Sequence, residues 1–180
     1  MQKYSFLAVL IVFVYSCGLY KEKSTSNESV IIDLRQLGIT YLADSVFEND
    51  RATHLLLGPK GYVLVGQYGY NDEFGNFNQI HHLPDAICSL SKLQVVDLSF
   101  NDIESLPVCF SMLNNITSIN LTFNRRFNVR KAIPILKRLK NLKNLSLYKC
   151  HFSLDDTTWI REQLMQPNLK LLLTDADSGR

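Results

Sequence analysis

Three pairs of residues in the sequence are of types that bind metals or catalyse reactions in other proteins. They are His81–His82, Asp155–Asp156 and Asp175–Asp177. Neighbouring residues of an extended segment point to opposite faces, so the two histidines do not converge on one metal ion. The first aspartate pair suits the N-terminus of a helix, where negative charge is favourable. The second pair lacks the remaining oxygen ligands of a calcium loop.

No catalytic motif accompanies these residues. The sequence contains neither a Gly-x-Ser-x-Gly nucleophile turn nor a phosphate-binding Gly-x-x-x-x-Gly-Lys-Ser/Thr loop. We therefore expect a protein that is not an enzyme and holds no metal ion or other cofactor. A net charge of +2 gives no indication of a nucleic-acid partner. The local excess of basic residues between 125 and 143 is interpreted as a solvated helix face.

Four cysteines occupy positions 17, 88, 109 and 150, which is too few for a small disulfide scaffold. Cys88 follows Leu83 by five residues, and Cys109 follows Leu106 by three; both leucines precede a proline. These turns correspond to each other in adjacent copies of a repeated pattern. Two interpretations of the Cys88 and Cys109 pair remain open: a disulfide in an exported protein, or two separate thiols.

The first sixteen residues are typical of an export signal. Lys3 is followed by an uncharged run over residues 4–15. Twelve residues of helix span about 18 Å, whereas a bilayer core of roughly 30 Å requires about 20 residues. Residues 1–16 are therefore predicted to be a signal peptide rather than a membrane-spanning helix.

The run ends in Val14-Tyr15-Ser16-Cys17, which resembles the lipobox of bacterial lipoproteins. Tyr15 is bulkier than the residue usual at its position. The resemblance implies that Cys17 becomes the first mature residue and carries a lipid such as palmitate. It further implies attachment to a membrane of the bacterial cell envelope, at the outer membrane or cell surface. The alternatives are an uncleaved anchor or an ordinary signal with a secreted product.

Two short segments separate this signal from the rest of the chain. Residues 17–30 are largely polar without a hydrophobic period, which predicts a flexible tether behind the lipid. Residues 31–50 carry apolar residues near helical spacing between positions 39 and 49. We interpret residues 31–50 as a cap that covers the first repeat of a solenoid.

A repeated pattern dominates the remaining sequence. Apolar residues at the first, fourth and sixth positions, with Asn or Cys at the ninth, recur from Leu93, Ile116 and Leu142, at intervals of 23 and 26 residues. Leu169 is interpreted as the first position of a partial copy, with Leu172 at its fourth.

An earlier copy is divided by an insertion. Its strand is expected at residues 52–57 and its second half at residues 80–84, with the insertion over 58–79. The insertion contains an apolar stretch at 62–65 that could form an extra strand. The repeat domain therefore covers residues 51–173, followed by a C-terminal tail at 174–180. The last repeat is either open or covered by a partner.

This pattern resembles the leucine-rich-repeat family over roughly residues 50–173. The resemblance implies an α/β solenoid of about four to five repeats, with parallel strands on the concave face. On the convex face we expect a short turn after Leu106-Pro107, then helices over 129–139 and about 156–165. Ser153 or Asp155 would cap the second helix.

The ninth position of each repeat lies where the backbone leaves the strand. The Asn101 and Asn124 side chains are expected to satisfy backbone groups that the turn leaves unpaired. Cys150 takes the same position in a longer repeat and is expected to be a buried structural thiol.

The outward strand positions should form columns on the concave face. One column holds Val95, Ser118 and Asn144, and the next holds Asp97, Asn120 and Ser146, followed by Ser99, Thr122 and Tyr148, then Phe100, Phe123 and Lys149. Polar residues beside aromatic ones suit a binding surface, although Phe100 and Phe123 could equally pack on each other. The predicted partner-binding residues are Asp97, Ser99, Phe100, Asn120, Thr122, Phe123, Ser146 and Tyr148.

These features together predict a non-enzymatic lipoprotein, displayed outside the cytoplasm, that binds a protein partner through its concave face. One alternative is a glycan-binding surface protein, since aromatic residues beside Asp and Asn suit sugars. Another is an accessory structural subunit of a membrane-associated assembly, docked through the insertion or the C-terminal end.

Overall fold

The computed structural model of the chain describes residues 29–60 and 77–174. The predicted signal peptide, the lipidation site Cys17 and nearly all of the predicted tether lie outside the described residues. The same holds for the middle of the insertion, including the apolar stretch at 62–65, and for all but the first residue of the C-terminal tail.

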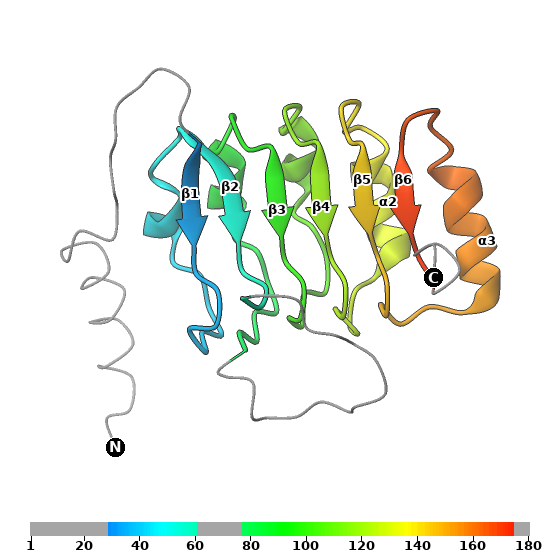
Figure 1. Cartoon of the computed structure of the whole chain (residues 1–180), viewed down its shortest axis with the longest axis horizontal. Coiled ribbons are helices and arrows are strands. Elements are labelled where there is room, and N and C mark those ends of the chain that lie inside the picture. Colours follow the sequence, from blue (N-terminus) through cyan, green and yellow to red (C-terminus); the bar gives the residue numbers. More distant parts are fainter. Residues whose placement is uncertain (1–28, 61–76, 175–180) are drawn as a thin grey trace.

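In the described residues, six strands form one parallel sheet whose order follows the sequence (Figure 1). They are β1 (Val30–Asp33), β2 (Ala52–Leu56), β3 (Val95–Asp97), β4 (Ser118–Asn120), β5 (Asn144–Ser146) and β6 (Lys170–Leu172). Val95 pairs with Ser118, and Ser118 pairs with Asn144. Equivalent repeat positions are therefore direct neighbours across the sheet, as the repeat pattern predicts.

The strand β1 lies within the segment predicted to be a cap. Ile32 pairs with Leu55 and is buried, so this segment adds a repeat to the sheet. The helix expected over 39–49 is limited to one 3₁₀ turn, η1 (Asp44–Phe47), with Phe47 buried. The ninth position of this repeat is Leu37 rather than Asn, which concealed the pattern.

The register of β6 differs from the predicted alignment by one residue. Leu171, not Leu172, pairs with Leu145 at the fourth position of the repeat. Successive strand residues face opposite sides of a sheet, so this shift exchanges the two faces. Leu173 consequently lies in the core, 3% exposed, and Leu172 lies on the open face.

The connections between strands cover one side of the sheet and change from 3₁₀ turns to helices along the chain. They contain the 3₁₀ turns η3 (Asp85–Ser89) and η4 (Val108–Met112), then the helices α2 (Val129–Leu136) and α3 (Leu154–Gln163). Figure 1 shows α2 behind β5 and β6, and α3 beside β6 at the end of the sheet. This order of short turns followed by helices agrees with the sequence pattern.

Side-chain caps define where both helices begin. The Asn128 side chain accepts a hydrogen bond from the Lys131 amide at 3.0 Å. Ser153 caps α3 by accepting from the Asp156 amide at 3.1 Å, while the Asp156 carboxylate accepts from the Ser153 amide at 3.1 Å. This reciprocal box starts α3 two residues before the predicted position, because Asp156 is the third helical residue rather than the first.

The core lies between the sheet and these connections. It is built from the fourth and sixth repeat positions, among them Val96, Ile119 and Leu145, each 1% exposed. Full burial of such a side chain contributes roughly 1.5–3 kcal/mol. Because these positions must face inward, the third and fifth positions face outward, and the sheet keeps one open face.

Candidate functional site

The turn after each strand is held by the ninth repeat position. The Asn101 carbonyl oxygen accepts from the Ile80 amide at 3.1 Å, and its amide group donates to the Ser99 carbonyl at 3.0 Å. Asn124 likewise accepts from the Ile103 amide at 2.8 Å. Each asparagine therefore joins two repeats by satisfying backbone groups that the turn leaves unpaired.

Cys150 takes the place of this asparagine in the repeat that begins at Leu142. Its thiol donates to the Leu121 carbonyl at 3.2 Å. Burial raises the pKa of the Cys150 thiol to about 12, because a thiolate in apolar surroundings is unfavourable. A buried neutral thiol of this kind is structural rather than nucleophilic.

The structure adds one asparagine that the sequence pattern did not identify. Asn78 is 3% exposed, accepts from the Ile39 amide at 3.1 Å and donates to the Leu34 and Leu57 carbonyls at 2.8 and 2.9 Å. It is the ninth residue of the interrupted repeat, so the extra residues enter between Gly58 and Phe77. A sequence pattern could have identified Asn78, because the dipeptide Phe77-Asn78 repeats Phe100-Asn101 and Phe123-Asn124.

The phenylalanines before these asparagines stack in a row. The ring centroids of Phe77 and Phe100 are 5.9 Å apart, and those of Phe100 and Phe123 are 4.6 Å apart. Tyr148 meets Phe123 edge-on at 6.2 Å. Phe100 and Phe123 have φ values of 55° and 60°, which cost roughly 1–2 kcal/mol each. Aromatic pairs contribute about 0.5–1.5 kcal/mol, so the stacking offsets much of this backbone strain.

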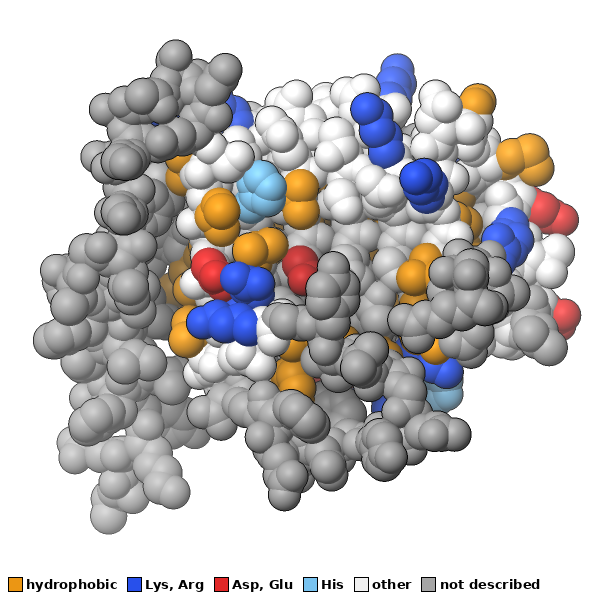
Figure 2. All heavy atoms as spheres, in the orientation of Figure 1, with side chains coloured by type: hydrophobic (Ala, Val, Ile, Leu, Met, Phe, Trp, Pro, Cys, Tyr) orange, Lys and Arg blue, Asp and Glu red, His pale blue; other side chains and the backbone are white. Residues whose placement is uncertain are grey.

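The open face of the sheet corresponds to the predicted concave face, and Figure 2 views the molecule from this side. Its third-position column contains Ile31, His54, Val95, Ser118, Asn144 and Lys170, and its fifth-position column contains Asp33, Leu56, Asp97, Asn120, Ser146 and Leu172. We call the part over β1–β3 the N-terminal half of the face, and the part over β4–β6 the C-terminal half.

Polar side chains in the N-terminal half are paired with each other. Arg35 makes two bonds to Asp33, of 2.8 Å from Nε and 2.7 Å from Nη2, and these hold the pKa of Asp33 below its usual value. The Ser99 hydroxyl donates to Asp97 at 2.7 Å. Figure 2 shows the resulting neighbouring red and blue side chains near β1–β3. Of the predicted binding residues, Ser99 is 3% exposed and so offers little to a partner, and Asp97 is already engaged.

A glycine makes room for this arrangement. A Cβ atom on Gly58 would lie 2.4 Å from the Ser99 hydroxyl and 2.8 Å from an Asp97 carboxylate oxygen. Both distances are below van der Waals contact, so the Asp97–Ser99 pair occupies the space that a side chain at position 58 would require.

The C-terminal half contains a hollow of about 250 Å³, lined by Ser118, Ile119, Asn120, Asn144, Leu145, Ser146, Lys170, Leu171 and Leu172. Within residues 29–60 and 77–174, the side chains of Ser118, Asn144 and Lys170 have no hydrogen-bond or ion-pair partner. Asn120 accepts from the Thr122 amide at 3.1 Å, and the Thr122 and Ser146 hydroxyls lie 2.6 Å apart. The hollow therefore has a hydrogen-bonding surface that is only partly used within the chain.

A second groove, of about 670 Å³, lies where α2 and α3 begin. It contains several of the basic residues noted in the sequence. Arg126 pairs with Glu104 at 2.7 Å, and Arg130 pairs with Asp156 at 2.6 Å and lies 4.6 Å from the centre of the Trp159 ring. Hydrogen bonds from Ser153 and Arg130 also lower the pKa of Asp156. These contacts link consecutive repeats and give both arginines a structural partner.

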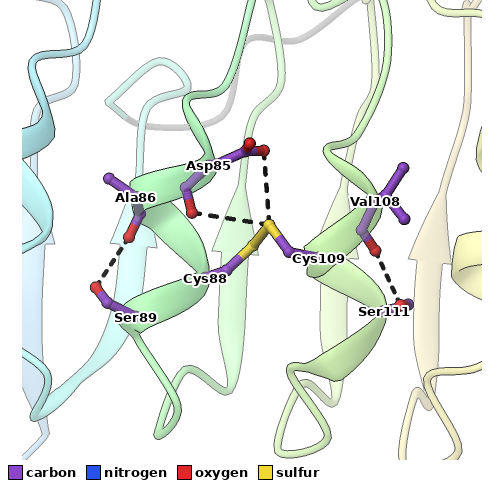
Figure 3. The surroundings of a disulfide bond; sticks show 7 residues. All are labelled: Asp85, Ala86, Cys88, Ser89, Val108, Cys109 and Ser111. Atoms are coloured by element: carbon purple, nitrogen blue, oxygen red, sulfur yellow. Dashed lines mark hydrogen bonds between the residues drawn. A yellow bond between two sulfur atoms is a disulfide. The ribbon is translucent and has the colours of Figure 1, made fainter.

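A disulfide joins two adjacent connections (Figure 3). Cys88 in η3 and Cys109 in η4 are bonded, with their Cα atoms 5.9 Å apart. The Cys109 sulfur also lies 3.7 Å from the Asp85 carboxylate. The structure thus contains the first of the two alternatives left open by the sequence. A crosslink closing a loop of this length stabilises a fold by about 3 kcal/mol in the chain-entropy model.

Neither a cluster of metal ligands nor a membrane-crossing helix occurs in the described ranges 29–60 and 77–174. In the part of the chain that the structure describes, no three His, Cys, Asp or Glu side chains are grouped as metal ligands. The His81 and His82 ring centroids lie 6.4 Å apart. Neither α2 nor α3 combines the length and apolar character of a membrane-crossing helix, and no other described helix does.

Comparison with known proteins supports the repeat assignment. A family model described as leucine rich repeat matches residues 76–125. A leucine-rich-repeat protein of Leptospira interrogans superposes with a TM-score of 0.54 at 24% identity, covering 74% of this chain but only 28% of the other. The ectodomain of a receptor kinase from Arabidopsis thaliana aligns over 97% of this chain and 93% of its own length, with a TM-score of 0.49 and 18% identity. No curated protein matches the sequence.

These findings confirm the predicted fold class, an α/β leucine-rich-repeat solenoid with one open parallel sheet. The chain spans little more than a quarter of the Leptospira interrogans protein. At such low identity the resemblance concerns the fold alone, so any partner must be argued from the residues of this chain.

Proposed function

We propose that this leucine-rich-repeat protein is a non-enzymatic binding module, exported and held on a bacterial membrane by a lipid on Cys17. It binds a protein partner with the C-terminal half of its open face. Fold alone does not specify a function, because function depends on the site that a fold carries.

The observation that carries this proposal is the difference in side-chain pairing across the face. Asp33 and Asp97 of the N-terminal half already have partners at 2.7 Å, whereas Ser118 and Asn144 have none among the described residues. A partner that approached the paired half would have to break existing bonds. One that approached the C-terminal half would find free donors and acceptors on a rigid sheet, which lowers the cost of binding.

Two further observations support export to an oxidising compartment. The Cys88–Cys109 bond is of a type that persists outside the reducing cytoplasm. The uncharged run over residues 4–15 ends at the lipobox-like Val14 to Cys17. Membrane attachment through Cys17 remains part of the proposal, and mass spectrometry of the mature N-terminus tests it. An acylated Cys17 supports attachment, and an unmodified mature N-terminus beyond residue 17 contradicts it.

The geometry favours a protein over a glycan. Sugars stack on exposed aromatic faces, but Phe123 lies between Phe100 and Tyr148, at centroid distances of 4.6 and 6.2 Å. The Lys149 ammonium lies 5.0 Å from the centre of the Tyr148 ring. The aromatic residues predicted to contact a partner are thus largely engaged with one another and with Lys149.

The test is capture of a partner on intact cells by crosslinking through the wild-type chain and two variants. Asn144→Trp places a bulky neutral side chain in the C-terminal half, and Thr158→Trp places one on the exposed surface of α3 in the same repeat. Both sites are exposed, so both variants should fold. We expect Asn144→Trp to reduce capture at least tenfold and Thr158→Trp to leave it unchanged. Equal capture by all three proteins would contradict the assignment of the binding site to the C-terminal half of the face.

A further inference from the structure

We infer that the C-terminal half of the face binds an extended acidic segment of its protein partner. This inference rests on the proposed function and specifies the chemistry of the ligand. It derives from the charge of this half, the position of its lysines and the neutral surface between them.

The charged residues of the described C-terminal half are lysines. Lys143 directly precedes β5, Lys170 begins β6 and Lys149 follows β5 by three residues. No Asp or Glu occurs in residues 116–124, 142–149 and 168–174, and Asp175, the next residue, lies outside the described residues. Figure 2 shows blue side chains over the β5 and β6 end of the face, and red ones at the edge of the molecule where α3 lies. A carboxylate-bearing ligand on β4–β6 would therefore be attracted by the lysines of these strands.

The lysines flank a floor of neutral polar groups. Lys143 and Lys170 lie at the start of their strands, and Lys149 lies beyond the other end of β5, in a turn where its φ is 57°. Six extended residues would span about 20 Å, so the two ends are less than about 20 Å apart. Between them lie Asn144 and Ser146, which line the 250 Å³ hollow. An extended peptide of about six residues would span this distance, with carboxylates near its ends and backbone amides over the hollow.

The N-terminal half limits where such a segment can lie. Asp33 and Asp97 give that half two carboxylates, and Arg35 is committed to Asp33 at 2.7 Å. Lys60 also acts on the Asp33 carboxylate and helps to lower its pKa, so the charges of this half balance. A partner carboxylate placed there would meet carboxylates and cations together, so β4–β6, with its lysines, is the more favourable position.

The same residues favour a peptide over a nucleic acid. Single-stranded nucleic acids bind where aromatic rings offer their faces to bases beside a continuous cationic track. Here Phe123 is stacked on Phe100 at 4.6 Å, and the three lysines are separated by neutral residues. Amide and hydroxyl groups such as those of Asn144 and Ser118 match the donors and acceptors of a peptide backbone.

The test measures binding of three fluorescent probes to the full chain by anisotropy at several salt concentrations. The probes are a decapeptide of alternating Glu and Ser, the same peptide with Gln in place of Glu, and an oligothymidylate of equal charge. We expect the acidic peptide to bind most tightly and to weaken as salt rises, because exposed ion pairs are screened. Tighter binding of the oligonucleotide, or equal binding of the Gln peptide, overturns the inference.

Substitutions of lysines test whether the acidic peptide binds to the C-terminal half of the face. Lys143→Gln with Lys170→Gln should weaken the acidic peptide roughly threefold to thirtyfold, the range for two exposed pairs. The matched control is Lys131→Gln with Lys137→Gln, which removes equal charge from the α2 side and should change binding less than twofold. Equal losses in both double variants mean that only net charge is sensed, which contradicts the inference.

The capture experiment, repeated with the lysine variants, distinguishes failure of this inference from failure of the proposed function. If Asn144→Trp abolishes capture while Lys143→Gln with Lys170→Gln does not alter it, the face binds a partner but not through acidic groups. If neither alters capture, the proposed function itself fails.

Discussion

The two halves of the open face use the same backbone but treat their polar side chains differently. In the N-terminal half, Asp33 and Asp97 each bond a residue two positions later, Arg35 and Ser99. In the C-terminal half, Asn120 also bonds two positions later, through the Thr122 amide, but Ser118 and Asn144 have no partner among the described residues. An outward polar residue of a repeat is thus free for a ligand only where neither its own repeat nor the neighbouring one pairs it, as the Thr122–Ser146 contact between two repeats illustrates.

The contacts between the connections behind the two halves of the sheet differ as well. The short turns η3 and η4 are joined by the Cys88–Cys109 bond, whereas α2 and α3 are joined by the Arg130–Asp156 pair. A covalent link braces the paired half, and side-chain contacts brace the half proposed to bind. Both halves nevertheless depend on the ninth repeat position, which allows a direct test of their stability.

The largest effect is expected at that position. Asn101→Ala removes the acceptor of the Ile80 amide and the donor to the Ser99 carbonyl, both buried. Leaving such groups unpaired should lower the free energy of unfolding by about 3 kcal/mol. Cys150→Ala, its counterpart near β5, loses one thiol contact and should cost about 1 kcal/mol. Urea unfolding measures both, and equal losses would contradict the asymmetry between Asn and Cys turns.

A smaller effect is expected at the seventh position of the repeat. Gly58→Ala forces a methyl group against the Ser99 hydroxyl, 2.4 Å away, and overpacking of this kind costs about 2 kcal/mol. Adding Ser99→Gly should restore part of the loss by removing the nearest atom. Thr122→Ala, at the same position of the C-terminal half, removes a hydroxyl contact and should cost about 1 kcal/mol. A thermal melt in which Gly58→Ala matches the wild-type protein would show that the Asp97–Ser99 pair is not tightly held.

The smallest effect concerns pH. The Arg35 hydrogen bonds lower the pKa of Asp33 from its usual 3.8. Asp33 therefore contributes stability that is complete above about pH 4 and is lost as the pH falls through its lowered pKa. Because the pair is partly exposed, we expect less than about 1 kcal/mol.

Arg35→Gln tests this contribution. An NMR titration of the Asp33 carboxyl should show its pKa rising toward 3.8 in this variant. Lys170→Gln in the C-terminal half has no carboxylate partner to release and serves as the control. An unchanged Asp33 titration in Arg35→Gln would remove the evidence that the N-terminal half is internally paired.

The central repeats could be predicted from the sequence because their pattern has a direct physical cause. Leu98 and Leu121 at the sixth position are 0% exposed, and Asn101 and Asn124 at the ninth hold the turns. Apolar side chains must be buried and turn groups must be paired, so both requirements appear in the residue types. The columns on β3, β4 and β5 follow from this alignment alone.

The ends of the sheet could not be predicted in the same way. In β6 the run Leu171-Leu172-Leu173 is apolar throughout, so its period does not select a face; only pairing with Leu145 sets the register. In β1 the absence of an asparagine at Leu37 hid the repeat. Asn78 was concealed because its strand β2 ends at Leu56, on the other side of the insertion.

The sequence by itself determined the solenoid: which residues enter the core, where each turn falls and which positions face outward. The tertiary structure alone decided which outward residues are available for binding. Whether Asp97 is free depends on the Ser99 rotamer and on the space above Gly58 in the neighbouring repeat. Residue type governs burial, which is a property of each side chain, whereas pairing depends on distances of a few ångströms between side chains that only the folded chain brings together.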